Sequence, residues 1–404
     1  MAAGAAAAAT APSEARTVAA AVGDAIATAV VDSPLYPFLL KSARTTMKKA
    51  VAGFVQWDEV VAERKAAADW EAAVNAVKAT RPDIVVPDYY IRKFHAYDDG
   101  NLCLDAALEQ DLASAAVGAR NYPDIAEAGE RKLRDSYNLC LNELGAYVPA
   151  DSVVVDFGCG TGISTVDLAK QFPQASKVIG IDLSPHMISV GKFLLEERTK
   201  ELKPAVEFIY GDIATQLLPA NSAAFVSLNL VLHELPNDAR RAIFAEALRI
   251  LKPGGALGIM EMDPDAPGQV KLRANAVLFS IMKSTEPYLD QYFASAGNLA
   301  EELLEVGFPV VREAAATGRH KGMVAFKAGA VDLRNEREFE PSKELVVERA
   351  QAFLVNIVGY QDEQLVARFT GFALPDSNGV DTLVVTSDIF GIEGISFQAN
   401  ITFL

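Results

Sequence analysis

The stretch that decides the fold reads VVVDFGCGTG and runs from Val153 to Gly162. A continuous apolar run ends in Asp156, and glycines follow at Gly158, Gly160 and Gly162. Continuous apolar runs are typical of strands that are covered on both faces. Glycines permit tight turns and close approach of a ligand to the backbone, and the N-terminus of a following helix attracts the negative part of a ligand. The stretch therefore predicts a buried strand, a ligand-binding turn and a helix.

Short β-branched runs alternate with helical segments after Ser152, which is typical of βαβ units and a parallel sheet. We expect strands that start at Val153, Lys177, Val206, Ala224 and Ala256. Farther along the chain, residues 309–313 and 323–326 flank a polar loop and predict a closing hairpin. We expect His320 in that loop and assign no function to it.

Three more motifs follow the glycine turn. The second predicted strand ends in Asp182, 22 residues after Gly160, where a carboxylate can accept both hydroxyls of a ribose. The third ends in YGDI, so that Asp212 and Ile213 can grip an adenine through one polar and one apolar side chain. The segment LKPGG, residues 251–255, then leads into the fifth strand.

These four motifs, in this order and at this spacing, resemble the class I S-adenosylmethionine-dependent methyltransferases over residues 150–328. The resemblance implies a doubly wound α/β fold with a seven-stranded Rossmann-like sheet, strand order 3-2-1-4-5-7-6, and an antiparallel seventh strand. It implies S-adenosyl-L-methionine as cofactor and S-adenosyl-L-homocysteine as product. The cofactor residues it implies are Asp156, Gly158, Cys159, Gly160, Thr161 and Gly162 near the methionine part, Asp182 and Leu183 on the ribose, Gly211, Asp212 and Ile213 on adenine, and Asn229 beside the methionine end.

The segment from Tyr89 to Arg120 is similar to one found in methyltransferases of plants, algae and related microbes. The resemblance implies that this segment helps to close the cofactor and substrate pocket. His95 and Tyr97 are candidates for contact with the substrate; alternatively, they form hydrogen bonds within a helical cap.

The methyl group of a sulfonium is already activated, so such an enzyme positions the acceptor and excludes water. An oxygen or nitrogen acceptor usually needs a base. His233 and Glu234 follow the fourth strand, at the rim where substrates approach, so His233 is a candidate base or a structural residue. Tyr288, Tyr292 and Asp263 are further candidates; for the two tyrosines the alternative is core packing.

Composition narrows the function. The chain has 404 residues and a net charge of −16, which disfavours nucleic acids and anionic membranes as partners. We expect the helical N-terminal region and the insert over residues 275–293 to roof a closed pocket, which suits a small-molecule acceptor. Its three cysteines have no metal-ligand spacing, so we expect no metal and a reducing compartment, either cytoplasm or plastid stroma. No apolar run is long enough to predict a membrane span.

Changes in composition and in the spacing of apolar residues along the chain suggest four parts. They are a disordered or targeting tail (1–32), a helical cap (33–148), the cofactor-binding domain (149–329) and a C-terminal extension (330–404). In the cap we expect helices over residues 55–80, 105–119 and 127–144. In the extension we expect a helix marked by Val346, Ala350, Phe353 and Ile357, then a hairpin of residues 382–390 and 395–403.

The sequence leaves the acceptor atom open between oxygen, sulfur and nitrogen, and a small acid or a hydroxy or thioether acid is favoured. A homodimer is the assembly that we consider. One alternative function is an NAD(P)-dependent oxidoreductase, although Gly-x-Gly-x-Gly differs from the Gly-x-Gly-x-x-Gly of that class. The other is a scaffold or assembly protein that kept the fold without catalysis.

Overall fold

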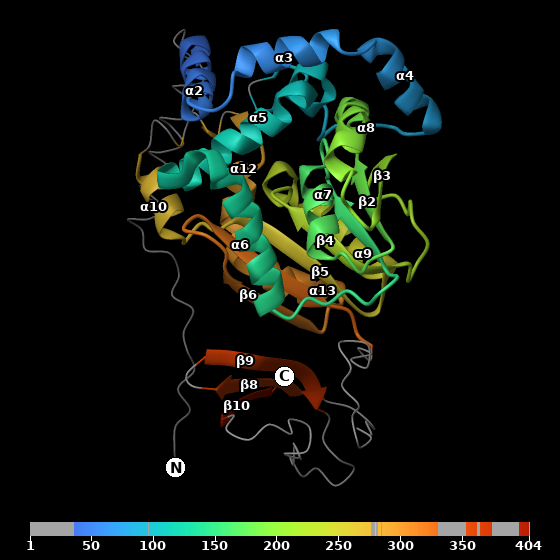
Figure 1. Ribbon diagram of the computed structural model, residues 1–404, viewed down its shortest axis with the longest axis vertical. Helices are drawn as coiled ribbons and strands as arrows, with labels where there is room; N and C mark the ends of the chain where they lie inside the picture. The colour runs from blue at the N-terminus through green and yellow to red at the C-terminus, as the bar shows by residue number, and fades with distance from the viewer. Residues whose placement is uncertain are drawn as a thin grey trace. The chain divides into compact units, whose positions relative to one another are not determined.

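A computed structural model describes residues 36–95, 97–275, 279, 282–283, 285–329, 353–361, 364–373 and 396–403 (Figure 1), with side chains between residues 44 and 329. The contacts divide the chain into two units, residues 1–332 and 333–404. The tail predicted over residues 1–32 lies outside the described residues.

The first unit is built on a seven-stranded sheet with the order β3-β2-β1-β4-β5-β7-β6. Its strands are β1 (Val153–Phe157), β2 (Lys177–Asp182), β3 (Ala205–Tyr210), β4 (Ala223–Asn229), β5 (Leu251–Met262), β6 (Val310–Ala315) and β7 (His320–Phe326). Strands β1 to β5 are parallel, whereas β7 is antiparallel to both β5 and β6. The predicted fold, strand order and closing hairpin are confirmed.

Helices cover both faces of this sheet. Helices α7 (Ile163–Gln171), α8 (Pro185–Thr199), α9 (Asn237–Ile250) and α13 (Leu299–Val306) connect or follow the strands. On one face, Gly258 of β5 leaves room for Tyr137 and Leu141 of α6 (Gly129–Glu143). On the other face, Leu257 and Ile259 join the core to which α9 and α13 contribute. The alternation along β5 therefore buries the strand on both sides, as a doubly wound fold requires.

The residues before the sheet form a helical cap of α2 (Tyr36–Val51), α3 (Trp57–Ala66), α4 (Trp70–Thr80), α5 (Leu104–Asn121) and α6. The prediction of a single helix over residues 55–80 is wrong, because a short non-helical segment separates α3 from α4. The carboxylate of Asp69 accepts a hydrogen bond from Ala72 N at 3.1 Å and so caps α4. The expected helix over residues 105–119 is present as α5, and that over 127–144 as α6.

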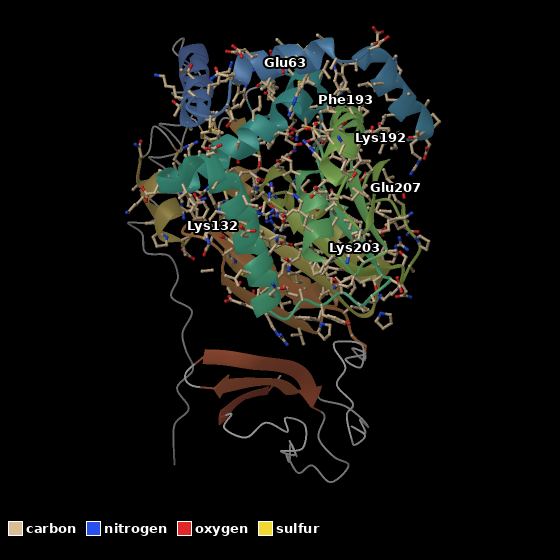
Figure 2. The ribbon with its side chains drawn as sticks, viewed as in Figure 1. Glu63, Lys132, Lys192, Phe193, Lys203 and Glu207 are labelled. Atoms are coloured by element: carbon tan, nitrogen blue, oxygen red, sulfur yellow. The ribbon has the colours of Figure 1, made fainter. Side chains whose placement is uncertain are left out.

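The cap contacts the sheet domain through α4 and α8. The rings of Trp70 and Phe193 meet edge to face, with centroids 5.2 Å apart. Phe193 is nevertheless 45% exposed and lies near the charged side chain of Lys192 at the edge of the domain (Figure 2). No helix among the described residues is long and apolar enough to cross a membrane.

The second unit is a three-stranded antiparallel sheet with the order β10-β8-β9. Its strands are β8 (Phe353–Gln361), β9 (Gln364–Ala373) and β10 (Ser396–Phe403). The helix predicted through Phe353 and Ile357 is wrong: these residues belong to β8, which pairs with strands on both sides. The strand predicted over residues 395–403 is confirmed as β10, and its predicted partner, residues 382–390, lies outside the described residues.

Candidate active site

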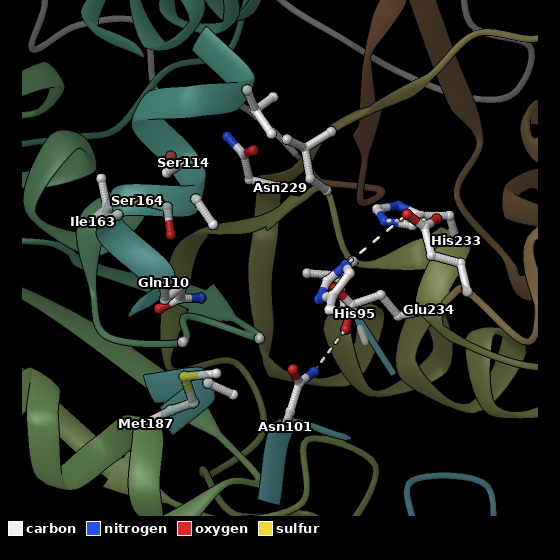
Figure 3. A pocket seen from close by; sticks show the side chains of 18 of the residues that line it. His95, Asn101, Gln110, Ser114, Ile163, Ser164, Met187, Asn229, His233 and Glu234 are labelled. Atoms are coloured by element: carbon white, nitrogen blue, oxygen red, sulfur yellow. Dashed lines mark hydrogen bonds and ion pairs between the residues drawn. The ribbon is translucent and has the colours of Figure 1, made fainter. Parts of the chain in front are cut away.

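A cavity of about 610 Å³ lies at the carboxyl ends of the parallel strands (Figure 3). This is where open α/β sheets bind ligands. Nine of the residues predicted to hold a cofactor line it: Gly158, Cys159, Gly160, Asp182, Leu183, Gly211, Asp212, Ile213 and Asn229. The cap closes the opposite side through residues such as Tyr89, Asn101, Gln110 and Ser114. The insert between β5 and α13 contributes Met282, Thr285 and Glu286.

The glycine turn after β1 needs its glycines for two reasons. Gly158, Gly160 and Gly162 have φ values of 68°, 54° and 88°, in the left-handed region that disfavours other residues. A Cβ at Gly160 would also meet Gln110 Nε2 at 2.0 Å, and one at Gly162 would meet the ring of Phe208 at 2.1 Å. The turn is therefore closely packed between the sheet and the cap.

Thr161 connects this turn to α5 and does not line the cavity. Its backbone N donates to Gln110 Oε1 at 2.5 Å, and its hydroxyl donates to Asp111 Oδ1 at 2.8 Å. The other oxygen of Asp111 pairs with Arg64, at 3.1 Å, and with Arg198 of α8. Two successive residues of the cap thus fix the position of the glycine turn.

Asp156 lies behind the turn and is not among the residues that line the cavity, so its place near the cofactor stays a prediction. Its Oδ2 accepts hydrogen bonds from Ser164 Oγ at 2.6 Å and Thr165 Oγ1 at 2.7 Å. Burial raises the pKa of Asp156 to about 6, although both hydroxyls oppose this shift. Asp156 therefore holds the first turn of α7, and Gly162 serves as the N-terminal cap residue of that helix.

Asp182, at the end of β2, is held rigidly at the cavity wall. One carboxylate oxygen accepts from Gly160 N and the other from Ser184 N, each at 2.8 Å. Tyr90, from the cap, lies near this carboxylate and favours its charged form. Burial raises the pKa of Asp182, and these donors work against that shift by favouring the charged form.

Two more polar groups face the cavity from the ends of β3 and β4. Oδ1 of Asp212, after β3, accepts from Ala214 N at 2.9 Å. Oδ1 of Asn229, at the end of β4, is buried and has no hydrogen-bond partner among the described residues. A buried amide oxygen without a partner is costly, so this atom is suited to accept a hydrogen bond from a bound molecule.

A charged cluster lies at the other end of the cavity. Nδ1 of His233 is 2.8 Å from Glu261 Oε1, and Glu261 is fully buried in β5. Nε2 of His233 is 3.9 Å from Glu286 Oε2. Burial disfavours the charged imidazole, but Glu261, Glu286 and Glu234 outweigh it and raise the pKa of His233 to about 10. His233 is therefore an imidazolium at neutral pH.

His95 lies on the other side of Glu286, with Nε2 4.0 Å from Glu286 Oε1. Its backbone N donates to Thr285 O at 2.8 Å, and 44% of its side chain is accessible. Partial loss of hydration, together with the charge of His233, lowers the pKa of His95 below its ordinary value. His95 is therefore neutral at physiological pH and faces the cavity.

Glu234 and Tyr97 also line the cavity, but each already has a partner. Glu234 Oε2 accepts from Asn101 Nδ2 at 3.1 Å, as the dashed line in Figure 3 marks, and burial raises the pKa of Glu234 to about 8. The Tyr97 hydroxyl donates to Glu109 Oε2 at 2.6 Å, an arrangement that matches the alternative of a hydrogen bond within the cap.

The other predicted catalytic residues do not line the cavity. Tyr292 is fully buried and its hydroxyl donates to Met262 O at 2.6 Å, so the core-packing alternative is correct for it. The hydroxyl of Tyr288 donates to Tyr89 O at 3.2 Å, and Asp263 accepts from Asp265 N at 3.0 Å. These three residues support the walls through hydrogen bonds to the backbone.

His320 corrects another expectation. It begins β7 instead of lying in the hairpin loop, is buried, and lines the cavity. Its Nδ1 is 2.8 Å from Thr317 Oγ1, and burial lowers its pKa to about 4. Among the residues that the structure describes, no group of three His, Cys, Asp or Glu side chains could hold a metal ion.

Sequence reasoning missed Glu261, Glu286, Tyr90 and Gln110. Glu261 carried a signal, because it is a charged residue inside an otherwise apolar strand and a buried charge needs a partner. Glu286 comes from the irregular insert, where no periodicity predicts which side chains point inward.

Comparison with known proteins identifies the family. Residues 154–255 match the family described as "Methyltransferase domain". The chain is 34% identical over 145 residues to trans-aconitate 2-methyltransferase of Azoarcus sp. (strain BH72), covering 35% of this chain and 53% of that protein. It is 30% identical over 173 residues to demethylmenaquinone methyltransferase of Listeria monocytogenes serotype 4a, covering 39% of this chain and 70% of that protein.

The chain belongs to the class I S-adenosylmethionine-dependent methyltransferases. It spans about half the length of the first of these relatives. Among solved structures, magnesium protoporphyrin IX methyltransferase from Synechocystis PCC 6803 has a TM-score of 0.39 at 19% identity, covering 54% of this chain and 87% of that one. The similarity of residues 89–120 to plant and algal enzymes stays a prediction.

The cofactor of this family, S-adenosyl-L-methionine, fits the residues present. The cavity supplies a carboxylate at Asp182, a polar and apolar pair at Asp212 and Ile213, and an unpartnered buried acceptor at Asn229. These groups line one continuous space with the glycine turn.

Proposed function

We propose that this protein transfers a methyl group from S-adenosyl-L-methionine to a small-molecule acceptor. The observation that carries the proposal is the single cavity, lined at one end by the glycine turn and Asp182 and at the other by His95 and His233. A cofactor and an acceptor held in one cavity can react in line, and the cap helps to exclude water.

For the cofactor, we assign the ribose hydroxyls to Asp182 and the adenine to Asp212 and Ile213. The methionine end belongs beside the turn from Gly158 to Gly160, with Asn229 Oδ1 accepting from its ammonium group. When bound, the cofactor supplies a methyl group that is already activated for transfer. Asp156, Thr161 and Gly162 act indirectly by shaping the turn.

His233 and His95, at the acceptor end of the cavity, differ in protonation state, and we assign them different roles. His233 already carries its proton at neutral pH, so it serves as a hydrogen-bond donor and not as a base. Nε2 of His95 lies at the cavity wall, 4.0 Å from Glu286 Oε1, so we assign to it the proton of a hydroxyl or amine acceptor, with Glu286 stabilising the imidazolium formed. A thioether or a carboxylate acceptor needs no base, and His95 then only positions it.

The names of the relatives support an acceptor of small size, since both act on small molecules according to those names. We favour a small acid or a hydroxy or thioether acid. Nucleic acid and membrane are not proposed as partners, in keeping with the net charge of −16. We also propose a homodimer as the assembly. Because Cys103, Cys140 and Cys159 are all free thiols, we propose a reducing compartment, either cytoplasm or plastid stroma, as the site of action.

The test is incubation of the full chain with S-adenosyl-L-methionine and a panel of carboxylic, hydroxy, thioether and phenolic acids. We expect formation of S-adenosyl-L-homocysteine together with an acceptor that has gained one methyl group. Binding of the cofactor with no turnover on any acceptor would instead favour the scaffold alternative. Tight binding of NADH without binding of S-adenosyl-L-methionine would favour the oxidoreductase.

A further inference from the structure

Arginine side chains line the cavity at its cap and hairpin walls. Among the described residues they are Arg44, Arg120, Arg134 and Arg319. Arg44 pairs with Glu109, and Arg134 pairs with Glu130 at 2.8 Å. Within the part of the chain that the structure describes, Arg120 and Arg319 form no ion pair with a carboxylate. Such a pair of free guanidinium groups in one cavity is unexpected in a chain with 53 acidic residues.

The two arginines come from different walls. Arg120 lies in the last turn of α5, in the cap, and its Nη1 donates to the sulfur of Met47 at 3.3 Å. Arg319 lies in the loop between β6 and β7. Its carbonyl accepts from Asp263 N at 3.0 Å, and its stem packs on Gly268, where a Cβ would meet Cγ of Arg319 at 2.5 Å. Arg319 is thus held in place by its backbone and stem, while its guanidinium stays free.

The two guanidinium groups carry like charges and line the same cavity. Arg120 is exposed, and partial loss of hydration together with the charge of Arg319 lowers its pKa. Two like charges without counterions destabilise a folded protein, and an anion between them would remove this repulsion.

The neighbouring side chains are neutral and suited to hydrogen bonding. Gln269 is 97% buried, lines the cavity, and has an Oε1 atom with no partner among the described residues. His320, next to Arg319, is also neutral, because burial lowers its pKa to about 4. An oxyanion that also carries a hydroxyl group could therefore use both the charges and the free amide oxygen.

We propose that Arg120 and Arg319 form a binding site for an oxyanion of the methyl acceptor, either a carboxylate or a phosphate. Guanidinium groups bind both through charge-assisted hydrogen bonds. The inference rests on the proposed function for the identity of the ligand as acceptor, but the anion site itself can be tested alone. It selects anionic acceptors against neutral molecules of the same shape.

The test is titration calorimetry with citrate, malonate, inorganic phosphate and the neutral malonamide, with and without saturating S-adenosyl-L-homocysteine. The variants are Arg120→Met and Arg319→Met, since methionine keeps an apolar stem against Met47 or Gly268. The control is Arg241→Met, which removes an exposed arginine of α9 that pairs with Glu305 outside the cavity.

We expect the wild type to bind citrate or phosphate. We expect malonamide to bind more weakly than malonate, by about tenfold or more. Each cavity variant should weaken binding of the anion by about tenfold or more, the usual effect of losing a charge-assisted hydrogen bond. S-adenosyl-L-homocysteine should bind all variants equally. Preference for citrate would identify a carboxylate site and preference for phosphate a phosphate site.

Binding of malonamide as tight as that of malonate, at a site that binds malonate, would overturn the inference. So would equal binding of the anion to the wild type and both variants, or no binding of any anion. Failure of the proposed function has a different signature, namely no binding of S-adenosyl-L-homocysteine to the folded wild type. The titration without S-adenosyl-L-homocysteine still tests the anion site in that case.

Discussion

Nδ1 of His233 lies 2.8 Å from Oε1 of the fully buried Glu261. The same carboxylate accepts from the backbone N of His233 at 3.2 Å and of Met262 at 2.7 Å. The pair joins the segment after β4 to β5 and fixes the orientation of the imidazole, so that Nε2 faces Glu286. This arrangement makes His233 a poor base and a good hydrogen-bond donor.

The first prediction concerns stability and pH. The pKa of His233 is raised from 6.5 to about 10, so the stabilisation by its proton is complete below pH 6.5 and is lost as pH rises toward 10. Glu261→Gln removes the carboxylate that stabilises this proton, and with it the dependence of stability on the protonation of His233. The free energy of unfolding of the wild type should therefore fall relative to that of Glu261→Gln between pH 7 and pH 10, as measured by urea denaturation.

At pH 7 the variant should be less stable by about 2 kcal/mol or more. Removing one partner of a buried ion pair typically costs about 3–5 kcal/mol, and a histidine can reduce this cost by releasing its proton. Glu305→Gln, at an exposed ion pair on α13, is the control and should change little. A stability difference between wild type and Glu261→Gln that stays constant from pH 7 to pH 10 would contradict the imidazolium assignment.

The second prediction separates the two histidines by kinetics. His95→Gln should lower kcat for a hydroxyl or amine acceptor by about 10²- to 10⁴-fold, since a general base usually contributes that much. It should leave kcat for a thioether or carboxylate acceptor within a few-fold. The assignment fails if His95→Gln slows both kinds of acceptor equally while His233→Asn slows only the acceptors that must lose a proton.

The third prediction concerns the glycine turn. Gly160→Ala introduces a Cβ at a φ of 54° and at 2.0 Å from Gln110 Nε2. We expect a loss of stability of about 1–3 kcal/mol from the backbone conformation and at least about tenfold weaker binding of S-adenosyl-L-homocysteine. Gly53→Ala is the matched control, because nothing lies within 4 Å of a Cβ there and its φ is not in the left-handed region. Normal binding by Gly160→Ala would show that the turn does not hold the cofactor.

The fourth prediction concerns the contact between cap and turn. Asp111→Ala leaves Arg64 and Arg198 without their shared carboxylate and removes the acceptor of the Thr161 hydroxyl. We expect a loss of about 2 kcal/mol in the free energy of unfolding, because the site is only partly buried. Asp58→Ala, at an exposed ion pair with Lys48, serves as control. A loss no larger than that of the control would mean that α5 does not hold the turn.

The sheet could be predicted because its signals are local. Val153–Gly162 encodes a strand, a turn and a helix start within ten residues, and the antiparallel pairing of β6 with β7 needs only a short loop. The break at Asp69 was missed because the apolar spacing continues through it, and only the capping aspartate reveals the helix start. At Phe353 and Ile357 the spacing of four residues fits a helix, but Phe353, Val355 and Ile357 are residue types enriched in strands and also recur at every second position.

The site was predictable only in part, for a physical reason. The cofactor end is built from strand ends at fixed spacing, so nine of its predicted residues line the cavity. The acceptor end brings together the cap, β5, the insert and the hairpin. Glu286 and Arg319 reach it through tertiary packing, which no local pattern in the sequence reports.

The most direct test of the account is calorimetric binding of S-adenosyl-L-methionine and S-adenosyl-L-homocysteine to the wild type, to Asp182→Asn and to the control Glu207→Gln. Glu207 lies on the outer strand β3, where it pairs with Lys177 outside the cavity (Figure 2). The account predicts binding of both ligands to wild type and control, weakened about tenfold or more in Asp182→Asn through loss of a charged hydrogen-bond acceptor. A folded wild type that binds neither ligand, or an Asp182→Asn variant that binds both as tightly, would contradict it.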